Sequence, residues 1–316
     1  MSNHPNVVNR PHNPKIKGDA SMTNLLEILG CKYPIIQGPI GHLNDPKMIA
    51  AVSEAGAFGV LALGFITDPE KVRTMVKEIK KVTDKPFGAN LMISMNPNND
   101  AILEMLAEEG VKVVTTSAGS PKTIYPKLKD LGLKGLHVTL TAKLAAKAND
   151  ADGIIVSGME AGGLRTNGPE STNLILVPAV CDMVDVPVVA AGGIADRRGY
   201  RAALALGAQG IQIGTALLAS EESPASEKWK DAILNCGEAG TTLLPVRNMA
   251  MRTIINSKLE KLITSGADLN GEYDMMNAYE AWSTGDFDLF PAGAGQVSAL
   301  IKEIRPVKDI IQEMVS

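Results

Sequence analysis

The sequence has too few histidines for a metal centre built from several imidazole ligands. Its 316 residues include four, and two of these fall in the first twenty residues, which show no secondary-structure pattern. The four are His4, His12, His42 and His137. Because histidine metal sites need several ligands at defined spacings, we expect no bound metal.

Cysteine is equally rare. Cys31, Cys181 and Cys236 are odd in number, lie far apart and form no C-x-x-C pair, which excludes a disulfide framework and a zinc knuckle. We expect them to be small buried residues. The absence of disulfides predicts a reducing, cytoplasmic location.

There is no excess of positive charge and no long apolar run. Lys and Arg number 31 against 35 Asp and Glu, a net charge of −4, so neither a nucleic acid nor an anionic membrane surface is an expected partner. The longest apolar stretches, Phe58–Leu63 and Val186–Ala191, have the length of strands and are far too short to span a membrane. Residues 1–20 lack the apolar centre of a signal peptide, and we expect them to form a flexible leader.

The chain repeats one unit: a short apolar run, then a glycine or proline, then an amphipathic helical pattern. The helix expected over Asp68–Val82 begins with Asp, Pro and Glu, which are typical of a capped first turn. Eight such units predict a (β/α)8 TIM barrel, with an open doubly wound sheet as the alternative. The eight predicted strands are Tyr33–Gln37, Phe58–Leu63, Phe87–Ile93, Val111–Thr115, Gly135–Val138, Gly153–Val156, Val186–Ala191 and Gly210–Ile213.

The chain after the eighth run is longer than one closing helix requires. Ile213 is followed by 103 residues, in which Arg247–Ile263 and Tyr273–Trp282 show helical patterns and no strand is evident. We therefore predict a small helical lid over residues 224–293. The barrel would comprise residues 21–223 and 294–316, with Gly295–Ile304 as its last helix.

Glycine and polar residues gather where the predicted strands end, the edge at which barrel enzymes place their chemistry. Gly192 and Gly193 follow strand seven, and Gly214 and Thr215 follow strand eight. Backbone N–H groups without obstructing side chains suit a phosphate, and barrels commonly bind phosphate at these two loops. The alternative is that these glycines only form tight turns.

Within the cofactors that carry a phosphate, the sequence favours FMN. Neither G-x-G-x-x-G after a strand nor G-x-x-x-x-G-K-[ST] occurs, which disfavours a Rossmann dinucleotide or a P-loop nucleotide. Asn90 could bind the edge of a flavin ring, or could only stabilise a turn. Glu160 lies near the predicted barrel mouth, where it could instead cap a helix or pair with Arg165.

At these residues the chain resembles the nitronate monooxygenase family (formerly 2-nitropropane dioxygenases), which includes the FMN-dependent enoyl-ACP reductase II enzymes. The resemblance runs from about Tyr33 to the C-terminus. It rests on QGPI (37–40), PFGANLM (86–92), VVTTSAGSP (113–121), GMEAGG (158–163), PVVAAGGIAD (187–196), GAQGIQIGT (207–215) and AGQVSALI (294–301).

The resemblance implies a barrel that binds FMN under a small helical domain. The positions it marks for FMN, together with the strand-end residues beside them, are Gly38, Pro39, Ile40, Asn90, Ser157, Gly162, Gly192, Gly193, Gln212, Ile213, Gly214 and Thr215. At the position of Ser157, some family members have Gln and others Glu.

The chain departs from the family at one important position. The family typically reads E-A-G-G-H-x-G, with the His proposed to transfer a proton beside the flavin, and here Leu164 replaces it. Leucine cannot transfer a proton, so that step is absent, unnecessary or performed elsewhere. His42 is the candidate catalytic replacement, unless it only caps the following helix. Leu164 and Arg165 are candidates for the substrate pocket, unless Arg165 only pairs with an acid.

Three functions follow as hypotheses. The first is reduction of an activated alkene, such as an enoyl thioester, by NADH or NADPH through FMN. The second is oxidation of alkyl nitronates with O2, and the third is a non-catalytic FMN-binding subunit. In each case the expected ligands are small molecules or acyl thioesters, and a homodimer is left open.

Overall fold

Eight parallel strands form the centre of the structure, a computed structural model that describes residues 19–41, 43–64, 66–148, 150–166, 168 and 170–316. Their order is β1-β9-β8-β6-β5-β4-β3-β2, and a parallel bridge between Ile36 and Phe58 joins β1 to β2. The prediction of a TIM barrel is therefore confirmed. The strands are β1 (Ile35–Gln37), β2 (Gly59–Ala62), β3 (Phe87–Met92), β4 (Val113–Ser117), β5 (Lys134–Thr139), β6 (Gly153–Ser157), β8 (Val188–Ala191) and β9 (Gly210–Ile213).

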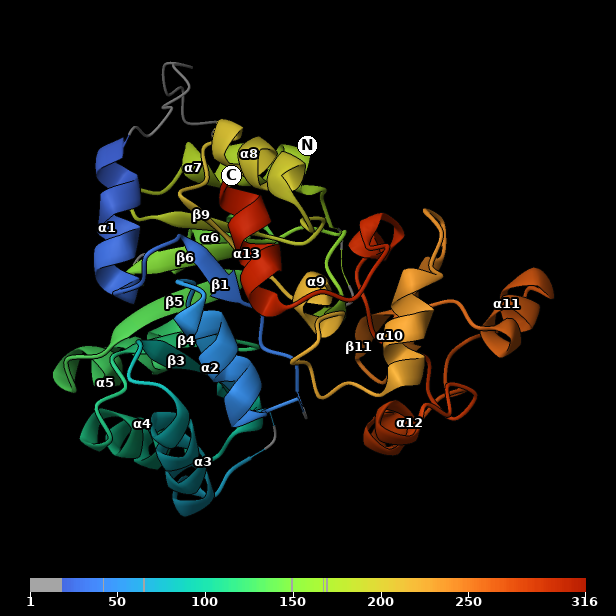
Figure 1. The fold of residues 1–316 in the computed structure, drawn as a ribbon, viewed down its shortest axis with the longest axis horizontal. Coiled ribbons are helices and arrows are strands. Elements are labelled where there is room, and N and C mark those ends of the chain that lie inside the picture. The colour runs from blue at the N-terminus through green and yellow to red at the C-terminus, as the bar shows by residue number, and fades with distance from the viewer. Residues whose placement is uncertain (1–18, 42, 65, 149, 167, 169) are drawn as a thin grey trace, which may run out of the picture.

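Helices surround these strands (Figure 1). The helix that begins at Pro69 does so for the reasons the sequence suggested: Asp68 accepts a hydrogen bond from the Glu70 N–H, and lysines occupy the last turn. The helices packed around the barrel are α1 (Asp19–Leu29), α2 (Pro46–Glu54), α3 (Pro69–Val82), α4 (Asn99–Glu108), α5 (Tyr125–Asp130), α6 (Ala142–Ala145), α7 (Asn173–Cys181), α8 (Arg197–Ala205), α9 (Thr215–Leu218) and α13 (Val307–Val315).

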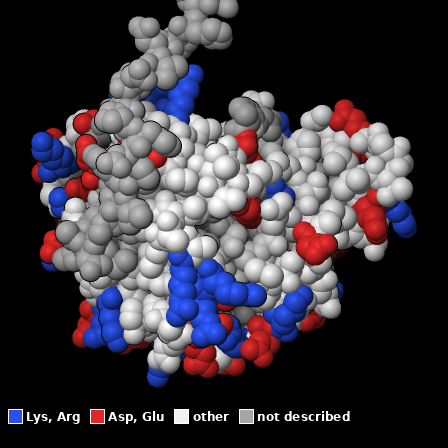
Figure 2. All heavy atoms as spheres, turned by 90° about the horizontal axis from the view of Figure 1, so that it is seen from above, with Lys and Arg blue, Asp and Glu red and all other residues white. Residues whose placement is uncertain are grey.

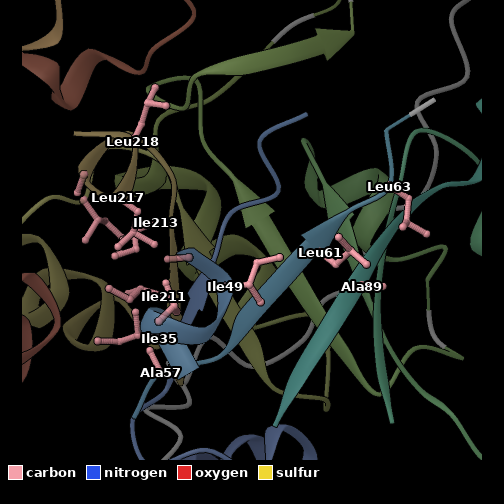
Figure 3. Close-up of a cluster of buried hydrophobic side chains, with 14 of the residues drawn as sticks. Ile35, Ile49, Ala57, Leu61, Leu63, Ala89, Ile211, Ile213, Leu217 and Leu218 are labelled. Atoms are coloured by element: carbon pink, nitrogen blue, oxygen red, sulfur yellow. The ribbon is translucent and has the colours of Figure 1, made fainter. Parts of the chain in front are cut away.

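Two apolar layers hold the barrel together. The inner layer fills the lumen, and α1 closes its amino end, because Leu25 lies against Gly210 at the start of β9. The strand residues of this layer are Ile36, Phe58, Val60, Val113, Leu136, Ile155, Val189 and Ala191. The outer layer packs the strands against the helices, and Figure 3 shows part of it around Ile35, Ile49 and Ile211. With the amino end closed, the free polar groups of the lumen lie at its carboxyl end.

The segment that we expected to be helical contains a β-hairpin, which corrects the prediction for Arg247–Ile263. Strands β10 (Thr241–Val246) and β11 (Met249–Ile254) pair antiparallel, and β11 also pairs with β7 (Gly163–Thr166) from the barrel part of the chain. Arg247 has a φ of +54° in the two-residue turn. Hairpin turns of this length usually carry Gly or Asn at such a position, so Arg-Asn provided little signal in the sequence.

Helices and aromatic side chains complete the inserted segment. Trp229 and Trp282 stack with ring centroids 4.8 Å apart, and their indole N–H groups donate to the carbonyls of Gly293 and Pro291. Phe290 lies edge-on to Trp282 at 5.9 Å. This cluster is continuous with the outer apolar layer of the barrel. Its helices are α10 (Glu227–Leu234), α11 (Ser257–Thr264) and α12 (Ala278–Thr284), with η3 (Met275–Asn277) before α12.

The last barrel helix also differs from the prediction. Gly295–Ile304 holds only the short 3-10 helix η4 (Gln296–Leu300), and the closing helix is α13 (Val307–Val315). Pro306 precedes its first turn, where a missing N–H has no cost. Ile310, Ile311 and Met314 then bury one face of it, a helical spacing that was readable in the sequence.

The surface carries charges of both signs. On the face in Figure 2, Lys and Arg gather below a stretch of uncharged side chains, with Asp and Glu beside them. In the described part of the chain, no helix is both long and apolar enough to cross a membrane. Residues 1–18 of the expected leader lie outside that part.

His137 is a buried member of the barrel wall. It is 5% exposed, its Nδ1 lies 2.8 Å from the Thr116 hydroxyl, and the Tyr125 ring meets it edge-on. Burial lowers the pKa of His137 to about 4, because the charged ring would lose its hydration.

We expect His137 to make the folded state less stable in acid. Between about pH 6.5 and 4 the unfolded chain binds a proton that the folded chain does not. The free energy of unfolding therefore decreases by up to about 3 kcal/mol as the pH is lowered through this range. Denaturant unfolding of wild type and His137→Gln at pH 7 and pH 5 measures this. The variant should lose less stability between the two pH values, and an equal loss in both proteins would contradict the assignment.

A second stability prediction concerns the approach of β2, β3 and β4 inside the barrel. A Cβ on Gly88 would lie 2.6 Å from the Val113 oxygen and 2.7 Å from the Phe58 ring. Gly88→Ala should therefore destabilise the fold by about 1–3 kcal/mol, as overpacking does. Gly237→Ala is the control, since a Cβ there meets open space. Thermal unfolding of the two variants should differ clearly, and equal midpoints would show that the barrel wall relaxes without cost.

Candidate functional site

Two polar side chains, Ser157 and Gln212, lie on either side of Ala191 in one row across the carboxyl ends of β6, β8 and β9. The strand register pairs Ser157 with Ala191 and Ala191 with Gln212. Ala191 belongs to the lumen layer, so its two neighbours in register also face the lumen. The Gln212 Oε1 atom is buried and accepts no hydrogen bond from the described residues. Such an atom needs a donor, which a ligand in the lumen mouth could supply.

Asn90 lies on another side of the same mouth. It is 3% exposed, and its amide donates to the Thr115 hydroxyl at 3.0 Å and to the Thr115 carbonyl at 3.3 Å. The side chain is thus held within the strand layer and does not only stabilise a turn. Thr115 is a member of the site that the sequence analysis did not single out.

The glycine turn after β8 approaches the loop after β6 backbone to backbone. Gly192 and Gly193 have φ values of +95° and +73°, which disfavour any side chain. A Cβ on Gly192 would lie 2.7 Å from the Ala161 nitrogen. The Asn173 amide fastens this turn by donating to the carbonyls of Ala191 and Gly192.

The backbone at this point presents unused donors. In the described part of the chain, the N–H groups of Gly193 and Gly214 donate to no protein group, and a Cβ on Gly214 would meet nothing within 4 Å. The Thr215 hydroxyl accepts from the Gly295 N–H at 3.0 Å, which leaves its own proton free to donate. Donors without obstructing side chains are what an anionic phosphate needs.

The donors of Gly193, Gly214 and Thr215 form what we call the phosphate cradle. Two further close approaches of the backbone complete it. A Cβ on Gly162 would lie 2.6 Å from the Gly295 nitrogen. The Gly38 N–H donates to the Ile213 carbonyl at 2.7 Å, which holds the end of β1 against β9. The side chain of Ile213 is only 1% exposed and packs in the outer layer, so only the backbone of this residue can contact a ligand in the lumen mouth. Pro39 and Ile40 follow Gly38 and are half-buried.

Glu160 caps a helix, which was one of the two alternatives that the sequence left open for it. Its carboxylate accepts from the Asn173 N–H at 3.0 and 3.2 Å, at the start of α7. It forms no ion pair with Arg165.

Arg165 pairs with Glu170 through its Nε atom, and both side chains are buried. The other edge of the guanidinium faces the end of β6, where Nη2 donates to the Ser157 carbonyl at 3.2 Å and Nη1 to the Ala161 carbonyl at 3.4 Å. Because its donors are engaged, the geometry does not favour Arg165 as a direct substrate ligand.

Leu164 occupies the position of the family histidine. It lies in β7, the edge strand of the three-stranded sheet β10-β11-β7, which we call the inserted sheet. It stands opposite Met251 in the register, whereas Arg165 stands opposite Ala250 and therefore lies on the other face. Leu164 packs against the main apolar core. Its face is thus the apolar one, shared with Met251.

Arg252 is a buried site residue that the sequence analysis missed. It is 4% exposed and lies on the face of the sheet that carries Arg165. Its Nε donates to the Met159 carbonyl at 3.0 Å and its Nη1 to the Thr241 hydroxyl at 3.2 Å. Burial, and then the charge of Arg165, lower the pKa of Arg252. The contact joins strand β11 to the loop after β6.

The candidate catalytic residue His42 lies outside the described residues. Among the residues that the structure does describe, no group of three His, Cys, Asp or Glu side chains could hold a metal ion. His137, in the barrel wall, contacts Thr116 and not the row at the lumen mouth.

The arrangement as a whole fits a ligand with two parts. The backbone donors at Gly193 and Gly214 suit a phosphate, and the row from Ser157 to Gln212 suits the polar edge of a flat ring that offers both donors and acceptors. FMN has both parts.

The comparisons with known proteins identify the family of this chain. The family model described as nitronate monooxygenase matches residues 22–316. A Rhodococcus jostii protein named (3aS,4S,5R,7aS)-5-hydroxy-7a-methyl-1-oxo-octahydro-1H-indene-4-carboxyl-CoA dehydrogenase is 34% identical over 251 residues, which cover 79% of this chain and 70% of that protein.

Two solved structures are also similar. FabK from Thermotoga maritima superposes with a TM-score of 0.81 and 33% identity, covering 92% of this chain and 94% of that one. The nitroalkane oxidase from Streptomyces ansochromogenes has a TM-score of 0.78 and 25% identity, with coverage of 92% and 96%. With a family model that spans nearly the whole chain, this protein belongs to the nitronate monooxygenase family of oxidoreductases.

Proposed function

We propose that this chain is an FMN-dependent oxidoreductase that uses NADH or NADPH to reduce an activated alkene, such as an enoyl thioester. The observation that supports binding of FMN is the presence, at one barrel mouth, of the Gly193 and Gly214 N–H groups and the Gln212 oxygen, none of which has a partner among the described residues.

Different residues would bind the phosphate and the ring of the cofactor. The N–H groups of Gly193 and Gly214 and the Thr215 hydroxyl would bind its phosphate. Asn90, Ser157 and Gln212 would bind the polar edge of its ring. When bound, FMN would supply the hydride chemistry, with the hydride drawn from the reduced nicotinamide, and the second hydrogen of the reduced alkene would be a proton from water.

The inserted segment is proposed to act as a lid over the mouth. Residues 224–293 contain the aromatic cluster around Trp229 and Trp282, and Arg252 joins this segment to the loop after β6. A lid of this kind would exclude water from the reacting atoms.

Oxidation of a neutral nitroalkane is disfavoured for a chemical reason. Nitroalkane oxidation needs a base to remove a proton, and Leu164, which packs on the apolar face of the inserted sheet, cannot act as one. The relatives point to the acceptor class, since one is named as a carboxyl-CoA dehydrogenase. We therefore propose a thioester substrate.

Oxidation of preformed nitronates is the second candidate. It needs no base, and the name of the family favours it.

The two reactions are separated by their electron acceptors. The protein, purified with FMN and reduced anaerobically with NADH or NADPH, should be reoxidised by crotonyl-CoA, with the flavin absorbance returning. Flavin that stays reduced would refute alkene reduction. Oxygen consumption with propionate 3-nitronate, without nicotinamide, would establish the second candidate. Bound FMN with neither activity would indicate a non-catalytic subunit.

The cradle makes a separate prediction about affinity. Thr215→Val removes the hydroxyl proton that would reach the phosphate, and should weaken FMN binding about tenfold or more, as the loss of a hydrogen bond to a charged group does. Thr215→Ser keeps the hydroxyl and is the matched control. Fluorescence titration of the apoprotein measures both, and equal dissociation constants would remove Thr215 from the phosphate site.

A further inference from the structure

The guanidinium of Arg165 faces Ser157, one of the two polar side chains in the row across the ends of β6, β8 and β9. Its Nε edge is occupied by Glu170, which leaves Nη1 and Nη2 facing the end of β6. Nη2 lies 3.2 Å from the Ser157 carbonyl, and Nη1 lies 3.5 Å from the Ser157 hydroxyl, a long hydrogen bond. Arg165 and Glu170 form a buried ion pair without net charge, with side chains 1% and 8% exposed, so Ser157 faces the positive end of a dipole that solvent screens little.

This contact has a consequence for the Ser157 hydroxyl. A hydroxyl has one proton to donate and can also accept. Since its oxygen accepts from Arg165, its proton is available in the other direction, and the strand register points Ser157 into the lumen beside Ala191. Ser157 is half-buried, so a ligand in the mouth can reach it. The nearby positive charge makes this proton a stronger donor.

We propose that Arg165 acts through Ser157 as a positioning residue that raises the reduction potential of the bound flavin. A flavin gains negative charge when it takes up electrons, and a strengthened donor at the polar edge of its ring stabilises the reduced form more than the oxidised form. The inference rests on the proposed binding of FMN and adds the residue that tunes it.

A merely structural role for Arg165 is the competing explanation, because the same guanidinium also binds the Ala161 carbonyl. Arg252 provides the matched control. It is equally buried, lies on the same face of the inserted sheet and binds a carbonyl of the same loop, but it has no hydrogen bond to Ser157. Loss of either arginine should loosen the loop, whereas only Arg165 should tune the flavin through Ser157.

The test measures the midpoint potential of FMN-loaded protein against a reference dye, for wild type, Ser157→Ala, Arg165→Met, the double variant and Arg252→Met. We expect the first two substitutions each to lower the ratio of reduced to oxidised flavin about tenfold at a fixed potential, a shift of about 30 mV for two electrons. The double variant should shift no further than either single variant, because both act through one hydrogen bond. Arg252→Met should stay within about twofold of wild type.

The outcomes separate the inference from the proposed function. A wild-type chain that binds no FMN would refute both. FMN bound at an unchanged potential in Ser157→Ala, or additive shifts in the double variant, would refute the role of Arg165 alone. Ser157→Ala removes one oxygen atom from a half-buried side chain, so it keeps the inference falsifiable even if Arg165→Met does not fold.

Discussion

The site depends on the direct packing of three backbone segments against one another. The turn after β8 lies against the loop after β6 at Gly192 and Ala161, and the segment that returns from the insertion lies against the same loop at Gly295 and Gly162. A Cβ on Gly295 would lie 2.9 Å from the Glu160 carbonyl, and the next N–H, of Gln296, donates to that oxygen. Side chains are excluded at these points, so the backbone donors are left open toward the lumen mouth.

Buried charge holds the same region from the other side. Arg165 and Arg252 bind carbonyl groups of the loop after β6 from one face of the inserted sheet. A guanidinium taken out of water is costly unless its donors are used, so these contacts strongly favour one arrangement of loop and sheet. The insertion and the barrel therefore meet at the strand ends where the cofactor is proposed to bind. A change in the position of the lid would alter the surroundings of the cofactor.

The parts of the fold that were predictable are those with a local cause. Each barrel strand is an apolar run that ends in glycine or a polar residue, and the carboxyl ends of such strands must meet at one edge, so the sequence alone groups Asn90, Ser157 and Gln212. The hairpin was not predictable in this way, because its turn lacks glycine, β10 contains a proline and β11 mixes Met, Arg and Thr. Arg252 was missed because its partner, Met159, lies 93 residues earlier in the chain. The face on which Leu164 lies depends on the register with Met251, which the sequence does not state.

The central claim is that a backbone-built cradle at the barrel mouth binds the phosphate of FMN. Titration of the apoprotein with FMN and with riboflavin, which lacks only the phosphate, tests this claim most directly. FMN should bind at least about a hundredfold more tightly than riboflavin, since several charge-assisted hydrogen bonds are lost with the phosphate. Equal affinity for the two flavins, or no binding of either, would contradict it.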